Sequence, residues 1–228
     1  MTTDEILSVT KILLDYLVPT VKIFGFTLLF SIPLGMIAAM LKMCRFKPIS
    51  WLTNIYILLM LQVIAVYYII PYLKLAQGLP AFMTSALDMI NIRSENYMFY
   101  AVLTAFSLNY AAYFAEIFRG GIESIPKGQY EAAAALGFTK SQTFFRIILP
   151  QVIKRIVPAS SNEIITLVKD TSIANVVAYA EITLKARQQM QLYSSLIPLI
   201  IAGVFYFAMA MILTFVFSLI EKKLSYYK

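Results

Sequence analysis

The sequence contains no histidine, a single cysteine (Cys44) and few charged residues, which make up 14% of its 228 residues. Without histidine there are no imidazole-based catalytic triads, no zinc sites with histidine ligands and no haem held by histidine. One cysteine cannot form an internal disulfide. The acid and base groups left in apolar surroundings are carboxylates, lysines and tyrosines. Most hydrolytic chemistry is therefore disfavoured.

Apolar residues make up 60% of the chain, and its mean hydropathy is +0.76. This composition is typical of an integral membrane protein. A helix needs about 20 apolar residues to cross the hydrocarbon core. Five segments have this character, and they define the predicted spans: Ile23–Leu41, Trp51–Leu73, Met98–Phe118, Val157–Ala180 and Leu196–Ile220. We predict an all-α integral membrane protein with a single domain over residues 1–228.

The net charge of +7 is compatible with nucleic-acid binding, but the basic residues are distributed as in a membrane protein. Most lie in the loops after the first and third spans and in the C-terminal tail, opposed there only by Glu123, Glu131 and Glu221. These basic residues are Lys42, Arg45, Lys47, Arg119, Lys127, Lys140, Arg146, Lys154, Arg155, Lys222, Lys223 and Lys228. An excess of Lys and Arg marks the cytoplasmic side. We therefore expect the N-terminus outside, the C-terminus in the cytoplasm, and no nucleic-acid partner.

The first residues, MTTDEILSVTKILLDYL, lack the positively charged start of a cleavable signal peptide. Asp4 and Glu5 follow a candidate helix cap at Thr3. Apolar residues recur on one side of the predicted helix: Ile6, Val9, Leu13 and Leu17. This pattern predicts an amphipathic helix on the outer membrane surface. A frayed beginning of the first span is the alternative.

A polar stretch, EAAAALGFTKSQTFFRIILPQ (Glu131–Gln151), separates the third and fourth spans. The alanines favour helix, Gly137 suits a helix C-terminus, and Thr139 with Gln142 matches a capping box that opens a second helix. That helix is expected to end before Pro150. The result is a cytoplasmic helical hairpin with an apolar face formed by Phe138, Phe144, Phe145 and Ile148. The pattern leaves open whether this face rests on lipid headgroups or binds a cytoplasmic partner.

The fourth span carries polar residues that a helix surrounded by lipid would not tolerate: Asn162, Glu163, Thr166, Lys169, Asp170, Thr171 and Ser172. They must face protein or a water-filled cavity. Helical spacing places Glu163, Thr166 and Asp170 on one face, and Asn162, Thr166 and Lys169 on an adjoining one. In the third span a further polar face consists of Asn109, Tyr113 and Glu116.

The motif Glu131-Ala132-Ala133, followed by Gly137, Ile147 and Leu149-Pro150, resembles the EAA loop of ABC-importer permease subunits. Two longer segments, AAYFAEIFRGGIESIPKGQYEAAAALG and NEIITLVKDTSIANVVAYAEIT, are similar to permeases that import polar amino acids. The resemblance covers nearly the whole chain. One feature departs from it. The family usually has a segment like R-G-T-P-L before a Leu-Gln pair in the second span, whereas here Leu58–Met60 runs directly into Leu61-Gln62.

The resemblance implies the transmembrane domain of a type I ABC importer in the bacterial cytoplasmic membrane, working by alternating access. The implied partners are two copies of a cytoplasmic ATP-binding subunit, a second permease subunit (a copy of this chain or a related one) and an external solute-binding protein. ATP and Mg would be bound by the ATPase, so this chain, which has no P-loop, would hold no cofactor or metal and would not itself be an enzyme. The residues implied in coupling to the ATPase are Glu131, Ala132, Ala133, Gly137, Phe138, Phe144, Leu149 and Pro150.

A polar amino acid needs acceptors for its ammonium group and donors for its carboxylate. We expect a substrate pathway lined by Asn109, Tyr113, Glu116, Asn162, Glu163, Thr166, Lys169 and Asp170. Glu163 or Asp170 would meet the ammonium group, and Lys169 the carboxylate. Alternatively, Lys169 and Asp170 form structural charge pairs or mark a helix break. The excess of acidic groups favours a cationic or neutral substrate.

Two other functional classes compete with this interpretation. An ion-gradient transporter or channel would use the same buried charges as a relay, but it leaves the cytoplasmic hairpin unexplained. A membrane enzyme would depend on a carboxylate pair, for which Glu116 and Glu163 are the candidates.

Overall fold

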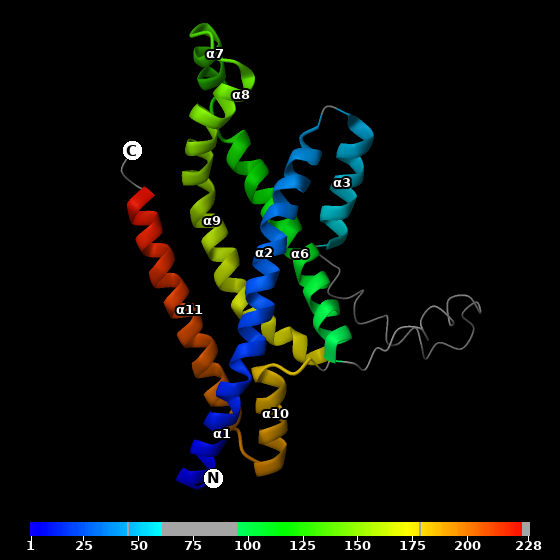
Figure 1. Ribbon diagram of the computed structural model, residues 1–228, viewed down its shortest axis with the longest axis vertical. Coiled ribbons are helices and arrows are strands. Elements are labelled where there is room, and N and C mark those ends of the chain that lie inside the picture. Colours follow the sequence, from blue (N-terminus) through cyan, green and yellow to red (C-terminus); the bar gives the residue numbers. More distant parts are fainter. Residues whose placement is uncertain (45, 61–94, 178, 225–228) are drawn as a thin grey trace, which may run out of the picture.

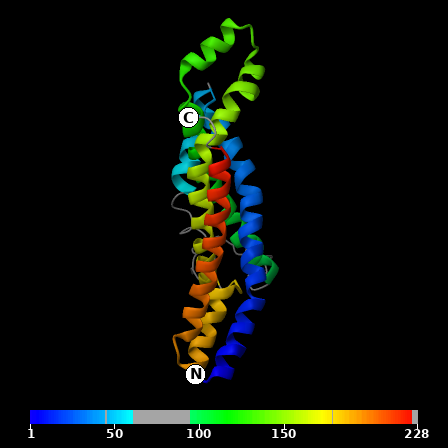
Figure 2. The same cartoon turned by 90° about the vertical axis from the view of Figure 1, so that its left-hand side faces the viewer.

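The structure is a computed structural model that describes residues 1–44, 46–60, 95–177 and 179–224. Long helices run side by side along one axis, and the hairpin of α7 and α8 extends beyond them at one end (Figure 1; Figure 2). The described elements are α1 (Thr3–Asp15), α2 (Leu17–Lys42), α3 (Lys47–Met60), α6 (Glu95–Glu123), α7 (Lys127–Ala135), α8 (Lys140–Gln142), η1 (Thr143–Ile148), α9 (Leu149–Asp170), η2 (Thr171–Val177), α10 (Ile182–Tyr193) and α11 (Ile197–Leu224).

The chain begins with a short helix, α1, that is capped one residue earlier than expected. The Thr2 hydroxyl, and not that of Thr3, accepts a hydrogen bond from the Glu5 backbone N–H, and the Glu5 carboxylate accepts one from the Thr2 backbone N–H. The apolar side of α1 buries Val9 and Leu13 against protein, in a cluster with Ile182 and Ala186 of α10 and Ala202 of α11. After a break at Tyr16 the chain continues directly into α2. Placement of α1 on the membrane surface stays a prediction.

Helices α2 and α6 form the central pair of the bundle. Gly35 of α2 lies directly on α6, because an added Cβ would come within 2.6 Å of the Phe114 Cβ and 3.0 Å of the Ala111 carbonyl oxygen. Small residues permit this kind of close helix approach in membranes. Gly35 therefore allows α2 to pack closely on α6, whereas nothing lies within 4 Å of a Cβ at Gly25. Pro33 is contained within α2.

Three of the described helical segments are long and apolar enough to cross a membrane: Thr3–Lys42, Met98–Glu123 and Ile197–Leu224. They contain the predicted first and third spans and, except for Leu196, the predicted fifth span. The second span begins within α3, and its remainder, with Leu61 and Gln62, lies outside the described residues. The count of five spans stays a prediction.

The fourth predicted span, Val157–Ala180, is not one continuous α-helix. The α-helix covers Leu149–Asp170, and the 3₁₀-helix η2 replaces it at Thr171. The Thr171 hydroxyl donates to the Val168 carbonyl oxygen at 2.7 Å, and the Asn175 amide donates to the Ser172 carbonyl oxygen. Polar side chains that bond nearby backbone carbonyls compete with regular helix. The helix break is thus encoded in the polar run that follows Lys169.

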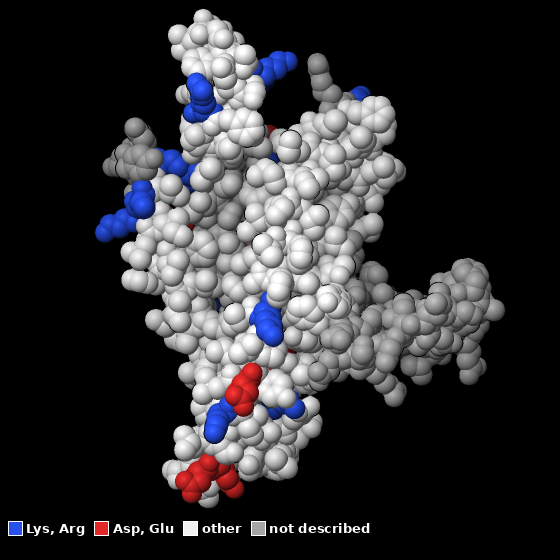
Figure 3. Space-filling view, viewed as in Figure 1, with Lys and Arg blue, Asp and Glu red and all other residues white. Residues whose placement is uncertain are grey.

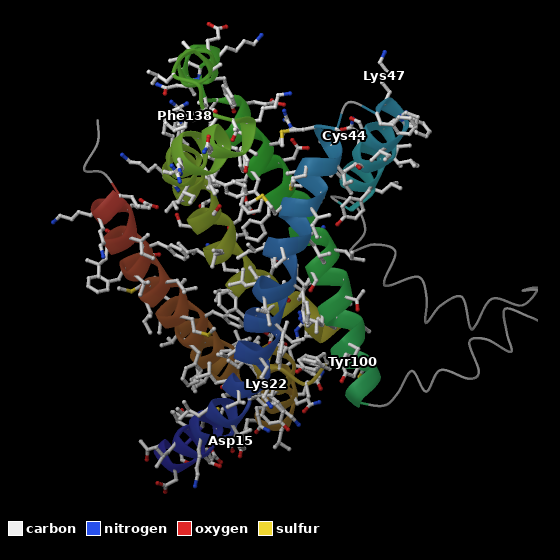
Figure 4. All side chains as sticks on the ribbon, turned by 45° about the horizontal axis from the view of Figure 1, so that its top comes forward. Asp15, Lys22, Cys44, Lys47, Tyr100 and Phe138 are labelled. Atoms are coloured by element: carbon white, nitrogen blue, oxygen red, sulfur yellow. The ribbon has the colours of Figure 1, made fainter. Side chains whose placement is uncertain are left out.

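The two ends of the molecule differ in charge. On the face shown in Figure 3, blue Lys and Arg atoms gather around the hairpin end, and most of the red acidic atoms lie at the opposite end. Figure 4 places Phe138, Cys44 and Lys47 toward the hairpin end, with Asp15 and Lys22 toward the other. The N-terminus lies at the end opposite the hairpin, and α11 runs back toward the hairpin end (Figure 1). This polarity matches the predicted grouping of basic residues.

Candidate functional site

The hairpin begins with α7 and turns sharply at Gly137. Gly137 has a φ of +78°, a left-handed conformation that residues with a Cβ rarely adopt. Its N–H donates to the Ala134 carbonyl oxygen at 3.0 Å, and the Phe138 N–H donates to the Ala133 carbonyl oxygen at 3.1 Å. These two bonds form a Schellman motif, which satisfies carbonyls left open at the helix end. The predicted cap at Gly137 is confirmed.

The second arm of the hairpin opens with the predicted capping box. The Thr139 hydroxyl accepts from the Gln142 N–H at 3.3 Å, and the Gln142 side chain accepts from the Thr139 N–H at 2.9 Å. The expected end before Pro150 is wrong. The chain widens into the π-helix η1, in which the Leu149 N–H bonds to Phe144 five residues earlier, and Pro150 is the second residue of α9. A proline in an α-helix clashes with the carbonyl four residues before it, and the wider π-turn relieves this clash.

The hairpin presents a mixed surface at its tip. Of the predicted coupling residues, Glu131, Ala132, Gly137 and Pro150 are exposed, Phe138, Phe144 and Leu149 are half-buried, and Ala133 is buried. Phe144 packs against the main core, so it anchors the hairpin to the bundle. The large apolar side chains most open to a partner here are Leu136, 76% exposed, and Phe145, 63% exposed. Leu136 was not among the predicted coupling residues.

A polar group of side chains joins α6 to the last turns of α9. The Tyr110 hydroxyl donates to Oδ2 of Asp170 at 2.6 Å. The Tyr113 ring lies 5.7 Å from the Tyr110 ring, and Tyr113 is close enough to Glu163 and Asp170 for both carboxylates to act on it electrostatically. Glu163 and Asp170, two turns apart on α9, are close enough for their charges to influence each other. Tyr113, Glu163 and Asp170 thus share one neighbourhood, and their role in a substrate pathway stays a prediction.

Other predicted pathway residues have different surroundings. Glu116 pairs with Lys42 of α2 and with Arg119 of its own helix, whose Nη2 lies 2.8 Å from the Glu116 carboxylate. Its place in the substrate pathway stays a prediction. Asn109 is buried within α6 and has a polar partner. The Thr166 hydroxyl donates to the Asn162 carbonyl oxygen of its own helix at 2.9 Å. Asn162 and Lys169 are exposed on the single chain.

A second polar cluster lies at the end opposite the hairpin, and it was not predicted from the sequence. Glu181 is 1% exposed, caps α10, and accepts from the backbone N–H groups of Thr183 and Leu184 at 2.7 and 2.8 Å. The Tyr206 hydroxyl of α11 also donates to it, at 2.7 Å. Burial raises the pKa of the Glu181 carboxyl, although these hydrogen bonds oppose the shift. Glu181 directly follows the predicted fourth span, and nothing in the local sequence pattern indicated that it is buried.

Residues 31–226 match the family described as "Binding-protein-dependent transport system inner membrane component". The chain belongs to this family. It is 36% identical over 219 residues to the arginine transport system permease protein ArtQ of Bacillus subtilis (strain 168), covering 93% of this chain and 92% of that protein. It is 32% identical to the L-cystine transport system permease protein TcyB of the same organism, covering 91% and 84% of the two chains.

Solved structures agree with the family assignment. The permease fold matches the crystal structure of an amino acid ABC transporter with histidines at a TM-score of 0.80 and 28% identity, over 98% of this chain and 100% of that one. An inward-facing structure of the MetNI methionine ABC transporter matches at a TM-score of 0.63 and 16% identity, over 99% and 100% of the two chains, and shows the likeness of fold alone. The described part of the chain has helices and no strands. The chain is thus a multi-pass permease component with the type I ABC importer fold, and ATP hydrolysis in such transporters lies in a separate subunit.

Proposed function

We propose that this permease imports polar amino acids carrying a positive charge, and that Glu163 and Asp170 receive the cationic group. The observation that carries the proposal is the pair of interacting carboxylates on α9, set beside Tyr110 and Tyr113 of α6. Two carboxylates in a membrane-spanning region are costly without a cation nearby. Among the relatives, ArtQ is named as an arginine permease.

The proposed mechanism uses the two ends of the molecule differently. An external solute-binding protein delivers the substrate at the end that carries the N-terminus. Two ATP-binding subunits, which hold ATP and Mg, engage the hairpin at the cytoplasmic end and drive alternating access. A second permease subunit, identical or related, completes the pathway, and Lys169 on the exposed side of α9 meets the substrate carboxylate. The basic surface around the hairpin supports this orientation (Figure 3).

Uptake into proteoliposomes containing the complete transporter tests the substrate class. With arginine, glutamine and cystine compared at equal concentration, we expect ATP-dependent uptake of arginine to be fastest. Glu163→Gln and Asp170→Asn should each raise the KM for arginine about tenfold or more, because a charge-assisted contact contributes about 1.5–3 kcal/mol. Glu5→Gln, which changes a half-buried capping carboxylate near the N-terminus, is the control and should leave this KM unchanged.

A different order of substrates would contradict the proposed preference for arginine. If glutamine or cystine is transported faster than arginine and both carboxylate variants keep the wild-type KM, the acidic pair does not select the substrate. Uptake that proceeds without ATP would instead support the ion-coupled alternative.

A further inference from the structure

Tyr110 is a deeply buried side chain beside the acidic pair. The residue is 1% exposed and belongs to the main core cluster, together with Phe114 and Leu167. Its hydroxyl donates a hydrogen bond to the Asp170 carboxylate at 2.6 Å. A buried tyrosine hydroxyl needs such a partner. A hydrogen bond to an ionised carboxylate is also stronger than one between neutral groups.

The bond engages one oxygen of Asp170 and leaves the other for a ligand. Among the residues that the structure describes, Tyr110 is the one hydrogen-bond donor to the Asp170 side chain. Asp170 is half-buried and lies close enough to Glu163, two turns earlier on α9, for the two charges to influence each other, and no described donor bonds its second oxygen. A carboxylate held through one oxygen presents the other in a fixed direction.

The position of Asp170 in α9 makes external support necessary. It is the last residue of the α-helix, where η2 begins. A carboxylate at a helix C-terminus is repelled by the helix dipole and has no intrahelical group to orient it. Tyr110 supplies that orientation from another helix. The Tyr113 ring, packed 5.7 Å from the Tyr110 ring, fixes the phenol in turn.

We infer that Tyr110 is a positioning residue for substrate binding: its hydroxyl fixes the Asp170 carboxylate so that the free oxygen, beside Glu163, receives the cationic group of the substrate. This inference rests on the proposed function and adds a residue that does not itself touch the substrate. It acts through Asp170, so its effect must disappear when Asp170 can no longer bind a cation.

The test compares Tyr110→Phe with Tyr56→Phe in the complete transporter, with arginine as the probe. Tyr56 is the matched control, since its hydroxyl also bridges two helices by donating at 2.8 Å to the Leu108 carbonyl oxygen. We expect Tyr110→Phe to raise the KM for arginine about tenfold, with the maximal rate of coupled ATP hydrolysis changed less than twofold. Tyr56→Phe should leave the KM at the wild-type value.

A double-substitution cycle separates positioning from a general structural role. When Tyr110→Phe is added to Asp170→Asn, the KM for arginine should stay at the value of Asp170→Asn alone, because the two residues act as one unit. The inference is overturned if Tyr110→Phe behaves like Tyr56→Phe, if it lowers the maximal rate without changing KM, or if the two substitutions multiply.

Assembly of each variant is checked by co-purification with the ATPase. Should Tyr110→Phe alone fail to assemble, Asp170→Glu provides a second measurement, because it keeps the negative charge but moves the carboxylate away from the position that the Tyr110 hydroxyl fixes. An arginine KM raised about tenfold in Asp170→Glu supports positioning, and a wild-type KM in this variant contradicts it. Failure of the proposed function is distinguishable, since Asp170→Asn itself would then have the wild-type KM.

Discussion

At the scale of single residues, two glycines of the same helix have opposite surroundings. Gly35 touches the backbone and Cβ of α6, whereas Gly25 has open space where its Cβ would lie. Alanine at Gly25 therefore reports the effect of helix propensity alone, whereas alanine at Gly35 also reports the cost of disturbing the contact between α2 and α6.

Gly35→Ala should lower the free energy of unfolding by about 1–3 kcal/mol, because the added methyl group overpacks the contact with Phe114. Gly25→Ala should be neutral or slightly stabilising, since alanine favours helix over glycine. Thermal unfolding in detergent measures both. Equal melting temperatures for the two variants would show that α2 and α6 do not approach as closely as Gly35 indicates.

The hairpin residues show how much a local pattern can predict. Gly137 and the Thr139–Gln142 box are encoded within a few residues, and both were predictable from the sequence. Pro150 was misread, because the local rule does not include a π-turn that lets a helix continue past a proline. The partners of Tyr110 and Glu116 depend on how separate helices pack, which no local spacing reveals.

At the scale of elements, the hairpin is held to the bundle on one side and open on the other. Phe144 and Ile148 pack into the main core, while Leu136 and Phe145 remain exposed. An exposed apolar tip beside basic residues is consistent with a protein-binding surface.

Leu136→Asp should abolish co-purification of the ATPase, because a charge would be buried in an apolar contact. Leu192→Asp is the matched control, since Leu192 is 70% exposed on α10 at the opposite end. It should leave ATPase binding intact. Loss of binding in both variants, or in neither, would argue against the hairpin as the docking site.

A second element-scale feature is the charged contact between α2 and α6 near the hairpin end. Glu116 connects Lys42 of α2 with Arg119 of its own helix, and Arg119 continues to Glu123. Glu116 is one-third exposed and Glu123 more than half exposed, so the contact that joins the two helices is the better shielded one.

Glu116→Gln should destabilise the α2–α6 contact by about 1–2 kcal/mol, because Lys42 loses its charged partner. Glu123→Gln should change stability by about 0.5 kcal/mol or less. Melting temperatures in detergent at low salt measure the difference. If Glu116 instead lined the substrate pathway, its amide would alter the KM for arginine without lowering the melting temperature.

At the scale of the whole molecule, Glu181 connects parts of the fold that are distant in sequence. It caps α10 and accepts from Tyr206 of α11, and the next residue, Ile182, donates its N–H to Thr20 of α2 at 3.3 Å. The Lys185 ammonium of α10 lies over the Tyr16 ring, 4.7 Å from its centroid.

The raised pKa of Glu181 gives a pH dependence of known sign. Because the folded state favours the protonated carboxyl, this group opposes folding above its folded pKa, and the penalty is relieved as the pH falls toward the ordinary value of 4.5. The glutamine side chain in Glu181→Gln carries no charge at any pH, so this variant lacks the titration. The melting temperature of the wild type, relative to Glu181→Gln, should therefore rise between pH 7 and pH 5. A constant difference over this range would contradict the shift.

The seven residues of η2 join Asp170, in the proposed substrate site, to the Glu181 cluster. A 3₁₀-helix rises about 2.0 Å per residue and an α-helix about 1.5 Å. Rewinding these seven residues as α-helix would shorten the segment by about 3.5 Å along its axis. A change between the two helix types would therefore couple cation binding at Asp170 to an axial displacement of the Glu181 cluster.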